Sequence, residues 1–502
     1  MRYRKTRSFI YCWDGDDLAY IPERSDKQVL IDKVFNPLEG TGVDTVFFLL
    51  GFGNVAEYPS KLLKMWGEGQ DYHFNGIGSY KRYAAVKRLL ERNEDPCHIL
   101  IEAAKERKLD AFYSFRLNDI HDHWPQYSDC MPRFKMDNPH WLNPKEWFPD
   151  FHGKTEITTA LNYTEKEVRD FRVSLIREVM ENHDFDGLEL DFMRSQFYFH
   201  WDKGLTSAYM MTDFVREVRE MLDELGEARG KSIELAVRVC TTVIGSNMAG
   251  FDVASWARLG LIDIVIAGTG GMNIDTKGYK EILEGTGVSF FPCLYGDYER
   301  TASSDEVMRG VAEVLLTEEP DGIYAFNMYP DERGRRELLR QIGSSRTLAG
   351  LDKTYIVDMD YDYNLTKEEW RYQPHLPAVL GETVREGLVV PIRAGEKLDG
   401  YPQVRARLKI WVKDWSIEDV YVFRFNGRTL PAPSPEGVPG QFEQYFLVWE
   451  LQPQEVDFRN EVYIQLKERN IHLKRYAPAV VQRIHIEVKF GDKNTAKEYS
   501  RS

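Results

Sequence analysis

The sequence predicts an α/β fold, a (β/α)8 barrel followed by an all-β antiparallel sandwich. Two observations lead to this fold class. Strand-like runs alternate with helix-like segments up to about residue 330, and beyond about Gly350 helical patterns nearly vanish while alternating strands take over. A chain of 502 residues also exceeds one ordinary domain. We therefore expect a barrel domain over 1–350, a sandwich domain over 351–490 and a polar tail over 491–502.

The predicted barrel strands are apolar runs rich in Ile, Val, Phe or Tyr, most of them bounded by Gly, Asp or Asn. They are Ser8–Asp14, Thr45–Gly51, Ala111–Asn118, Gly187–Phe192, Ile233–Cys240, Ile262–Gly268, Val288–Tyr295 and Gly322–Met328. Strands that alternate with helices favour a parallel sheet, and a barrel of this type needs roughly 250 residues or more. The alternative is an open doubly wound sheet. It would normally carry a glycine-rich phosphate turn, and Gly51-Phe-Gly53 lacks the third glycine of that motif.

Helix-like patterns separate most of these strands. The clearest is Thr164–Glu181, where Thr164 is placed to cap the helix and apolar residues recur at helical spacing. The other predicted helices are Tyr80–Asn93, Pro96–Lys108, Thr206–Leu225, Phe251–Gly260, Asp275–Glu284, Ser304–Thr317 and Arg333–Ser344.

The C-terminal third has the pattern of an antiparallel sandwich. Short alternating strands are divided by turns such as Asn426-Gly427. The predicted strands are Thr354–Met359, Leu388–Ile392, Arg405–Trp411, Val420–Phe425, Gln444–Trp449, Glu461–Leu466 and Val480–Phe490.

Composition narrows the class of partner. A net charge of −15 argues against nucleic acid, which favours a basic face. No apolar run approaches the length of a membrane span, so we expect no membrane partner. The five cysteines form no C-x-x-C pair, which favours a reduced, cytoplasmic protein over a disulfide framework. A secreted protein whose leader was removed is the alternative. A homo-oligomer is compatible with all of this.

The predicted strand ends locate a candidate site. In a (β/α)8 barrel the active site lies at the C-terminal ends of the strands. Polar and aromatic residues collect at that end of nearly every predicted strand. The fourth strand carries Glu189 and Asp191 on one face, because strand side chains alternate. Carboxylates on the inner face of a buried strand are costly unless paired, so this cluster is a functional candidate.

The expected pocket suits a sugar. Aromatic faces stack on the apolar faces of sugars, and the candidates for this role are Trp13, Trp124, Tyr295 and Tyr329. Amides and charged side chains bind hydroxyl groups. Paired carboxylates are what cleavage of a glycosidic bond requires, one as general acid and one as nucleophile or base. We therefore expect a glycoside or oligosaccharide substrate and no cofactor.

Two segments carry a resemblance to a known family. Asp186-Gly-Leu-Glu-Leu-Asp191, with an arginine shortly after it, and Arg116-Leu-Asn-Asp-Ile-His121 resemble barrel glycoside hydrolases described as family 10-like. The resemblance covers about residues 7–345 and implies a glycoside hydrolase. In the α-galactosidase-like clan the Asp that closes strand 4 is the nucleophile, which would give Asp191 that role.

Two departures limit the roles that can be carried over. The segment is similar to the Asp-Gly-x-Asp-x-Asp-x-Glu motif of family 18 chitinases, but Met193 stands where that family has its acid Glu. Family 10 xylanases carry a catalytic Glu at the end of strand 7. That strand ends here at Tyr295-Gly296, with Asp297 and Glu299 only in the following loop.

The expected catalytic residues are Asp191 as nucleophile or charge stabiliser, Glu189 as the residue that orients it or shares its proton, and Asp297 or Glu299 as acid partner. Asp119 and Asp122 are alternatives for the acid. The expected substrate-binding residues are Trp13, Asp14, Arg116, Asn118, Asp119, His121, Arg194, Arg238, Tyr295, Asn327 and Tyr329. The arginines fit either an acidic sugar or the neutralisation of buried acids.

Two other functions stay open. A barrel without a strand 7 Glu could bind carbohydrate without cleaving it. A metal-dependent barrel enzyme such as a sugar isomerase could use His121 and His123, although a metal needs a third ligand that the sequence does not identify.

Overall fold

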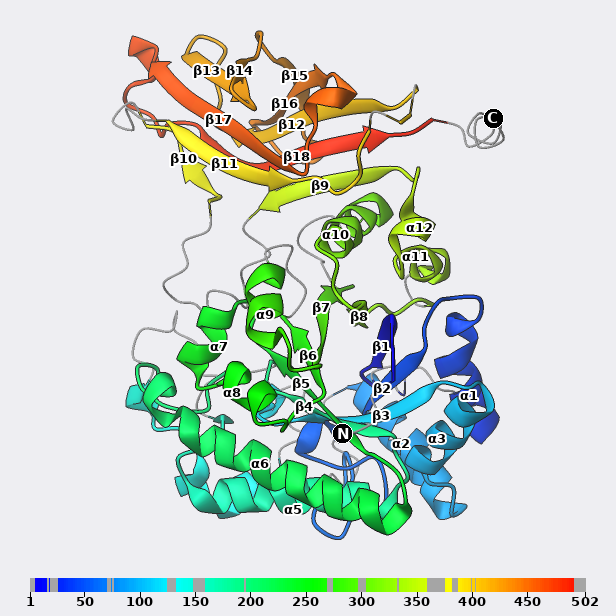
Figure 1. Cartoon of the computed structure of the whole chain (residues 1–502). Helices are drawn as coiled ribbons and strands as arrows, with labels where there is room; N and C mark the ends of the chain where they lie inside the picture. The colour runs from blue at the N-terminus through cyan, green and yellow to red at the C-terminus, as the bar shows by residue number, and fades with distance from the viewer. Residues whose placement is uncertain are drawn as a thin grey trace. The chain divides into compact units, whose positions relative to one another are not determined.

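The computed structural model describes residues 5–15, 18, 26–69, 74, 76–123, 132–147, 159–193, 196–268, 274–296, 304–331, 334–358, 375–381, 387–398, 400–401 and 403–491. The chain divides into two compact units, which are described separately below (Figure 1). The first contains residues up to Tyr295 together with Pro320–Leu339. The second contains Gly296–Glu319 and the chain from Arg340 onward, apart from a short stretch outside the described residues.

The first unit is built on a closed barrel of parallel strands in sequence order, as predicted. The last strand pairs with the first, so Phe9 lies opposite Ile323. The strands are β1 (Phe9–Trp13), β2 (Thr45–Leu49), β3 (Asp110–Arg116), β4 (Gly187–Asp191), β5 (Glu234–Val239), β6 (Ile264–Ala267), β7 (Ser289–Tyr295) and β8 (Ile323–Phe326).

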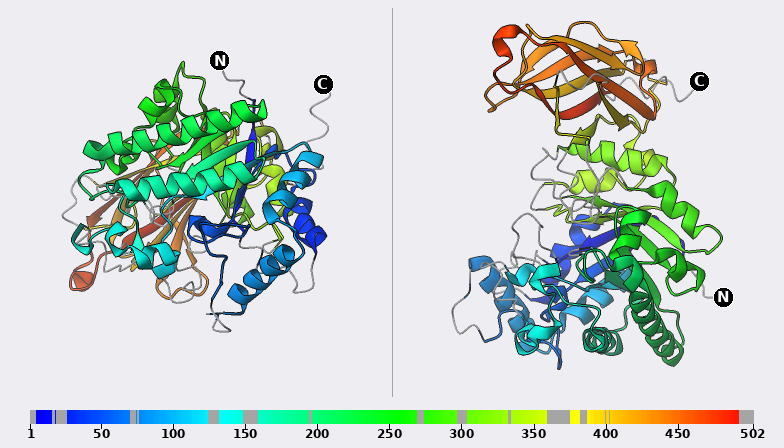
Figure 2. Two further views of the ribbon diagram at one scale, coloured as in Figure 1. Left: turned by 90° about the horizontal axis from the view of Figure 1, so that it is seen from below. Right: turned by 90° about the vertical axis from the view of Figure 1, so that its left-hand side faces the viewer.

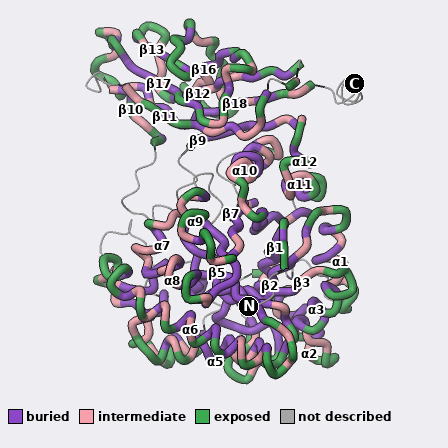
Figure 3. The backbone as a smooth tube through the Cα atoms, viewed as in Figure 1, coloured by how far each residue is buried: buried purple, intermediate pink, exposed green. Residues whose placement is uncertain are grey.

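The barrel interior is a packed core. Alternate residues of the strands point inward, and Phe47 stacks on Phe112 with ring centroids 4.6 Å apart. The intervening residues face the surrounding helices, so the strands are buried on both sides (Figure 3). This explains why they appear in the sequence as nearly continuous apolar runs.

The helices before α10 are α1 (Lys27–Phe35), α2 (Ile77–Glu91), α3 (Pro96–Glu106), α4 (Arg133–Asp137), α5 (Lys166–Asn182), α6 (Gly204–Arg229), α7 (Val243–Ala249), α8 (Val253–Arg258) and α9 (Thr276–Leu283). The long helices α5 and α6 lie side by side on the outside of the barrel (Figures 1 and 2). All eight predicted helices are present with shifted ends.

The cap predicted for α5 is wrong. Its N-cap is Glu165, which makes no side-chain cap bond. The Thr164 hydroxyl instead donates to Asn162 Oδ1 at 2.6 Å. The Thr164 hydroxyl therefore bonds to a nearby amide oxygen and does not cap the helix.

The second unit contains an antiparallel sandwich. One sheet has the order β10-β18-β12-β16-β15 with β9 paired to β18, and the other has the order β11-β17-β13-β14. The strands are β9 (Lys353–Asp358), β10 (Ala378–Val379), β11 (Leu388–Arg393), β12 (Arg405–Lys413), β13 (Val420–Phe425), β14 (Arg428–Thr429), β15 (Ser434–Gly437), β16 (Gln444–Leu451), β17 (Arg459–Glu468) and β18 (Val480–Lys489). Inward side chains of both sheets form one core.

Three helices precede the sandwich strands in the sequence. They are α10 (Asp305–Thr317), α11 (Arg336–Gln341) and α12 (Ser345–Leu348). Helix α10 belongs to the second unit, because Val314 joins the core that contains Tyr355 of β9. Gly310 allows this close packing, since a side chain there would meet the carbonyl of Thr354.

None of the helices in the described part of the chain has the length and apolar character needed to cross a membrane.

Gly187 at the start of β4 tests how tightly the barrel is packed. A Cβ atom there would overlap the ring of Phe112, so Gly187→Ala should destabilise the protein by about 1–3 kcal/mol through overpacking. Gly42→Ala is the matched control, because nothing lies within 4 Å of its added Cβ. Thermal unfolding of both variants would check this. Equal midpoints would contradict a rigid barrel interior at Phe112.

Candidate active site

Strand register brings a carboxylate between two arginines. Asp191, the last residue of β4, lies opposite Arg116 of β3 and Arg238 of β5. All three side chains share one inward-facing layer and are nearly fully buried. Two residues earlier, Glu189 lies opposite Ser114 and forms the next layer down. The predicted alternation of β4 is therefore confirmed.

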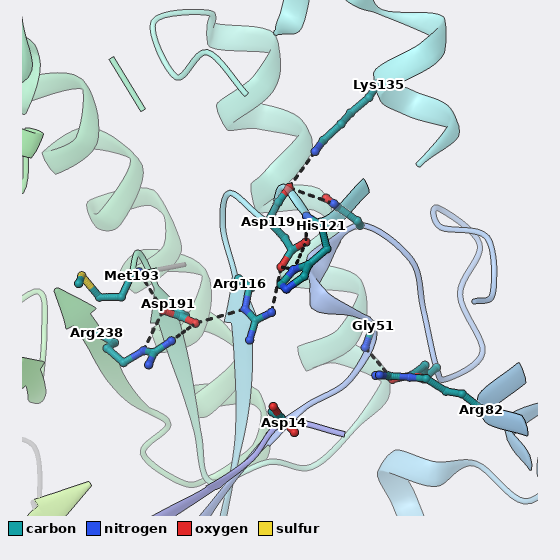
Figure 4. Close-up of polar contacts among 12 residues, drawn as sticks. Asp14, Gly51, Arg82, Arg116, Asp119, His121, Lys135, Asp191, Met193 and Arg238 are labelled. Carbon is teal, nitrogen blue, oxygen red and sulfur yellow. Dashed lines mark hydrogen bonds and ion pairs between the residues drawn. The ribbon is translucent and has the colours of Figure 1, made fainter. Parts of the chain in front are cut away.

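Asp191 is held by charged and neutral donors. Arg238 donates from Nε to Oδ1 at 2.9 Å and from Nη2 to Oδ2 at 2.6 Å. The backbone N–H of Met193 donates to Oδ1 at 2.9 Å, and Arg116 Nε lies 3.5 Å from Oδ2. Figure 4 shows the carboxylate between the two guanidinium groups. Burial alone would raise the pKa of Asp191, but Arg238 outweighs it and holds that pKa below its usual value.

The pKa of Glu189 is shifted in the opposite direction to that of Asp191. Ser114 donates a short hydrogen bond to its Oε2, and the Tyr324 hydroxyl donates to the same atom at 3.2 Å. Complete burial, together with the negative charge of Asp191, raises the pKa of Glu189 to about 7. Two carboxyl groups on one strand therefore favour different protonation states near neutral pH.

A second ion-paired group extends from the end of β3. Arg116 Nη1 donates to Asp119 Oδ2 at 2.9 Å, and the His121 ring nitrogen Nδ1 lies 2.7 Å from the same oxygen. Phe52 supports this group from the end of β2, because Arg116 lies 4.8 Å above its ring and His121 stacks on it. Asp122 is engaged separately by Lys135 at 2.9 Å.

The ends of β8 and β1 supply further polar groups, and those after β8 are under backbone strain. Asn327 and Tyr329 both have left-handed backbone conformations, with φ of 51° and 42°. Such strain in residues other than glycine clusters at functional sites. The Tyr329 hydroxyl donates to Asp14 Oδ2 at 2.8 Å. At the end of β7, the half-buried Tyr295 stacks on Phe326.

Several buried polar atoms of these residues have no hydrogen-bond partner within the described chain. They are Arg116 Nε, Glu189 Oε1, Arg238 Nη1 and Asn327 Oδ1. Buried polar groups are normally satisfied, and exceptions call for an explanation such as water, a ligand or catalysis. These unsatisfied atoms mark the C-terminal part of the barrel as a candidate site for a polar ligand or water.

Two expected substrate-binding residues have other surroundings. Trp13 is not an exposed aromatic platform: it is 2% exposed and packs edge-on against Phe48. The reason is strand alternation, because Ile10 and Cys12 of β1 take the inward positions. The Asn118 amide accepts from Leu161 N at 2.8 Å and donates to the Phe197 carbonyl at 3.0 Å, so it holds two loop segments.

Four expected site residues lie outside the described residues: Trp124, Arg194, Asp297 and Glu299. Their assignments stay predictions, as do the catalytic roles of Asp191 and Glu189. Sequence reasoning missed Ser114, Tyr324 and Phe52. Alternation along β3 could have found Ser114, which lies two residues before Arg116. Phe52 becomes a neighbour through the pairing of β2 with β3, whereas Tyr324 reaches Glu189 only because the barrel brings β8 near β4.

Similar proteins were sought by sequence and by structure. No protein-family model and no curated protein matches the sequence. The glycoside hydrolase domain of PgaB (BpsB) from Bordetella bronchiseptica has a TM-score of 0.45 at 11% identity, over 68% of this chain and 99% of that domain. The maltogenic α-amylase AmyB from Thermotoga neapolitana has a TM-score of 0.38 at 12% identity, over 95% and 98% of the two chains.

A cycloisomaltooligosaccharide glucanotransferase from Paenibacillus sp. has a TM-score of 0.35 at 8% identity, over 95% of this chain. This chain spans only 57% of that enzyme. Likenesses of this degree carry no argument about activity, so function is inferred from the site itself.

The raised pKa of Glu189 predicts how stability depends on pH. Between the ordinary value of 4.5 and about 7, the folded protein retains a proton that the unfolded chain has lost. The free energy of unfolding should therefore fall as pH rises through this window, by about 1.4 kcal/mol per unit of pKa difference. Glu189→Gln should remove this part of the slope.

Chemical unfolding at pH 5 and pH 8 would measure it, with Glu181→Gln on the exposed face of α5 as control. Identical slopes for wild type and Glu189→Gln would contradict a neutral Glu189.

Proposed function

We propose that this protein is a glycoside hydrolase that uses Asp191 at the reacting carbon of the sugar. One observation carries the proposal: Glu189 and Asp191 are adjacent carboxyl groups whose surroundings move their pKa values in opposite directions. Carboxyl pairs of this kind mark acid and base roles in enzymes. Their position at the C-terminal end of a barrel strand is where such folds carry catalysis.

Asp191 acts as the anionic partner in this proposal. Its ion pair with Arg238 keeps it ionised in a buried setting, as a nucleophile or base requires. In a retaining reaction, an Asp191 oxygen bonds to the anomeric carbon while the bond to the leaving oxygen breaks and that oxygen takes a proton. Water then releases the sugar, giving a proton to the acid partner that lost one in the first step, and restores the Asp191 carboxylate. The raised pKa of Glu189 lets it stay protonated below about pH 7, where it adds no second negative charge.

The proton donor in this proposal is Asp297 or Glu299, which follow β7 in the sequence. The alternatives are less suited to this role. Asp119 is bound by Arg116 and His121, and Asp122 is bound by Lys135. A carboxylate held in an ion pair is a poor proton donor, because the neighbouring cation favours its charged form.

A neutral sugar fits this site better than an acidic one. The two described arginines of the site are paired with Asp191 and Asp119, so they neutralise buried acids. Asn327, Tyr329 and Asp14 supply amide, hydroxyl and carboxylate groups for sugar hydroxyls. Tyr295 offers a partly exposed ring at the end of β7.

Carbohydrate binding without cleavage is a second candidate function. It is favoured by the engagement of both Asp191 oxygens, since Oδ1 accepts from Arg238 and Met193 while Oδ2 accepts from Arg238. A nucleophile in this setting must give up part of that hydrogen bonding when it reacts.

Turnover of a panel of 4-nitrophenyl glycosides and plant or algal oligosaccharides would test the proposal. Asp191→Asn should lower kcat by several orders of magnitude, because the amide is neither a nucleophile nor a base. Asp213→Asn, on the exposed face of α6, is the matched control and should keep full activity. Since Asp191→Asn leaves Arg238 with an unbalanced buried charge, thermal unfolding must show that the variant is folded.

The identity of the proton donor can be tested by changing the leaving group of the substrate. Asp297→Asn or Glu299→Gln should lower turnover of 4-nitrophenyl or sugar leaving groups by about 10²–10⁴-fold. The same variant should keep a nearly normal kcat/KM for dinitrophenyl glycosides, because that leaving group needs no proton in the first step. Full activity of folded Asp191→Asn would refute the central assignment. Sugar binding without turnover, in wild type and Asp191→Ala alike, would support the binding function.

A further inference from the structure

A second cluster of reactive side chains lies away from the strand ends. Asp95, Cys97 and His183 each offer one ligand atom, and these atoms all lie within 4.8 Å of one another. Asp95 and Cys97 belong to the start of α3, and His183 caps the C-terminus of α5. Cys97 and His183 are buried. Within the described residues, these three side chains form a group that could hold a metal ion.

A fourth potential ligand is adjacent. His98 follows Cys97 directly, and its Nδ1 lies 3.5 Å from Asp95 Oδ2. Its ring is 4.9 Å from the ring of His183. The His98 side chain is 57% exposed, so it is free to turn toward the cluster. One carboxylate, one thiol and two imidazoles thus gather at the junction of α3 and α5.

We propose that Asp95, Cys97, His98 and His183 form a structural zinc site. Zinc prefers four ligands in a tetrahedron and accepts Cys, His and Asp. A thiol ligand selects against Mg²⁺ and Ca²⁺, which bind oxygen. A thiolate, a carboxylate and two neutral imidazoles carry between them the two negative charges that balance Zn²⁺.

The outer contacts of the cluster match those of metal ligands. His183 Nδ1 lies 2.8 Å from the carbonyl oxygen of Val179 and can donate to it, which directs Nε2 at Asp95. A backbone carbonyl in this role orients histidine ligands in metal sites. Asp95 uses Oδ1 to accept from Cys97 N at 2.8 Å and cap α3, which leaves Oδ2 facing both histidines.

Only small movements would form the site. Zinc bonds of about 2.0–2.3 Å place ligand atoms roughly 3.3–3.8 Å apart in a tetrahedron. The distance of 2.8 Å between His183 Nε2 and Asp95 Oδ2 would widen, and side-chain rotation would bring the sulfur closer. Burial raises the pKa of the Cys97 thiol, and a bound metal would reverse this by displacing the proton.

The site would support the strand that carries Asp191. His183 lies four residues before β4 begins at Gly187. Its ring also packs edge-on against Tyr58 and Phe185. Zinc would join the start of α3 to the turn that enters β4, which is a stabilising role separate from catalysis. Without a metal, His183 and Asp95 alone would form a hydrogen-bonded pair in which the sulfur of Cys97 has no part.

Cys97 therefore separates the two possibilities. The full chain, prepared without a polyhistidine tag, should contain about one zinc ion per molecule by elemental analysis. Cys97→Ser should lose most of it. Added Co²⁺ should give thiolate charge-transfer absorption in the wild type and none in Cys97→Ser. Added Zn²⁺ should raise the unfolding midpoint of the metal-free wild type but not that of the variant.

His98→Gln provides a test that does not disturb the buried core. It should weaken Zn²⁺ binding by about tenfold or more. His140→Gln is the matched control, because His140 is another exposed histidine, 3.4 Å from the carboxylate of Glu167. It should bind Zn²⁺ like the wild type. A wild type that binds neither Zn²⁺ nor Co²⁺, or a Cys97→Ser variant that binds them equally well, would overturn the proposal.

Discussion

The ion pair between Asp191 and Arg238 is the interaction on which the site depends. Both groups are buried inside the barrel, where an unpaired charge costs several kcal/mol. The pairing is possible because β4 and β5 are in register at these two residues, with Arg116 on the other side in β3. A one-residue shift of either strand would point one partner out of the barrel and leave the other unbalanced.

The layer below follows from this pair. Complete burial, together with the negative charge that Arg238 stabilises on Asp191, raises the pKa of Glu189 to about 7. Ser114 and Tyr324 meet its Oε2, while its Oε1 has no partner within the described chain. The strand thus changes from apolar packing to a neutral acid and then to a charged carboxylate as it approaches its C-terminal end.

Much of the fold could be predicted, because apolar runs and helical periodicity are local properties. All eight barrel strands and the main sandwich strands lie where the patterns placed them. The predictions were wrong where a residue has a different hydrogen-bonding or packing partner from the one that the local pattern indicated. Thr164 bonds to Asn162 instead of capping α5, and Trp13 faces outward because its neighbours in β1 fill the barrel.

The sequence by itself determined the barrel, the sandwich and the acidic end of β4, since hydrophobic pattern and strand alternation follow directly from residue order. It left open whether the arginines would neutralise these acids or bind an acidic sugar. Tertiary structure decided which arginine meets which acid, that Asn118 holds loops, and that Tyr324 reaches Glu189 from β8. It also brought His183 to Asp95 across 88 positions of the chain. The physical reason is that strand register and barrel closure join residues distant in sequence, and burial then sets their charge.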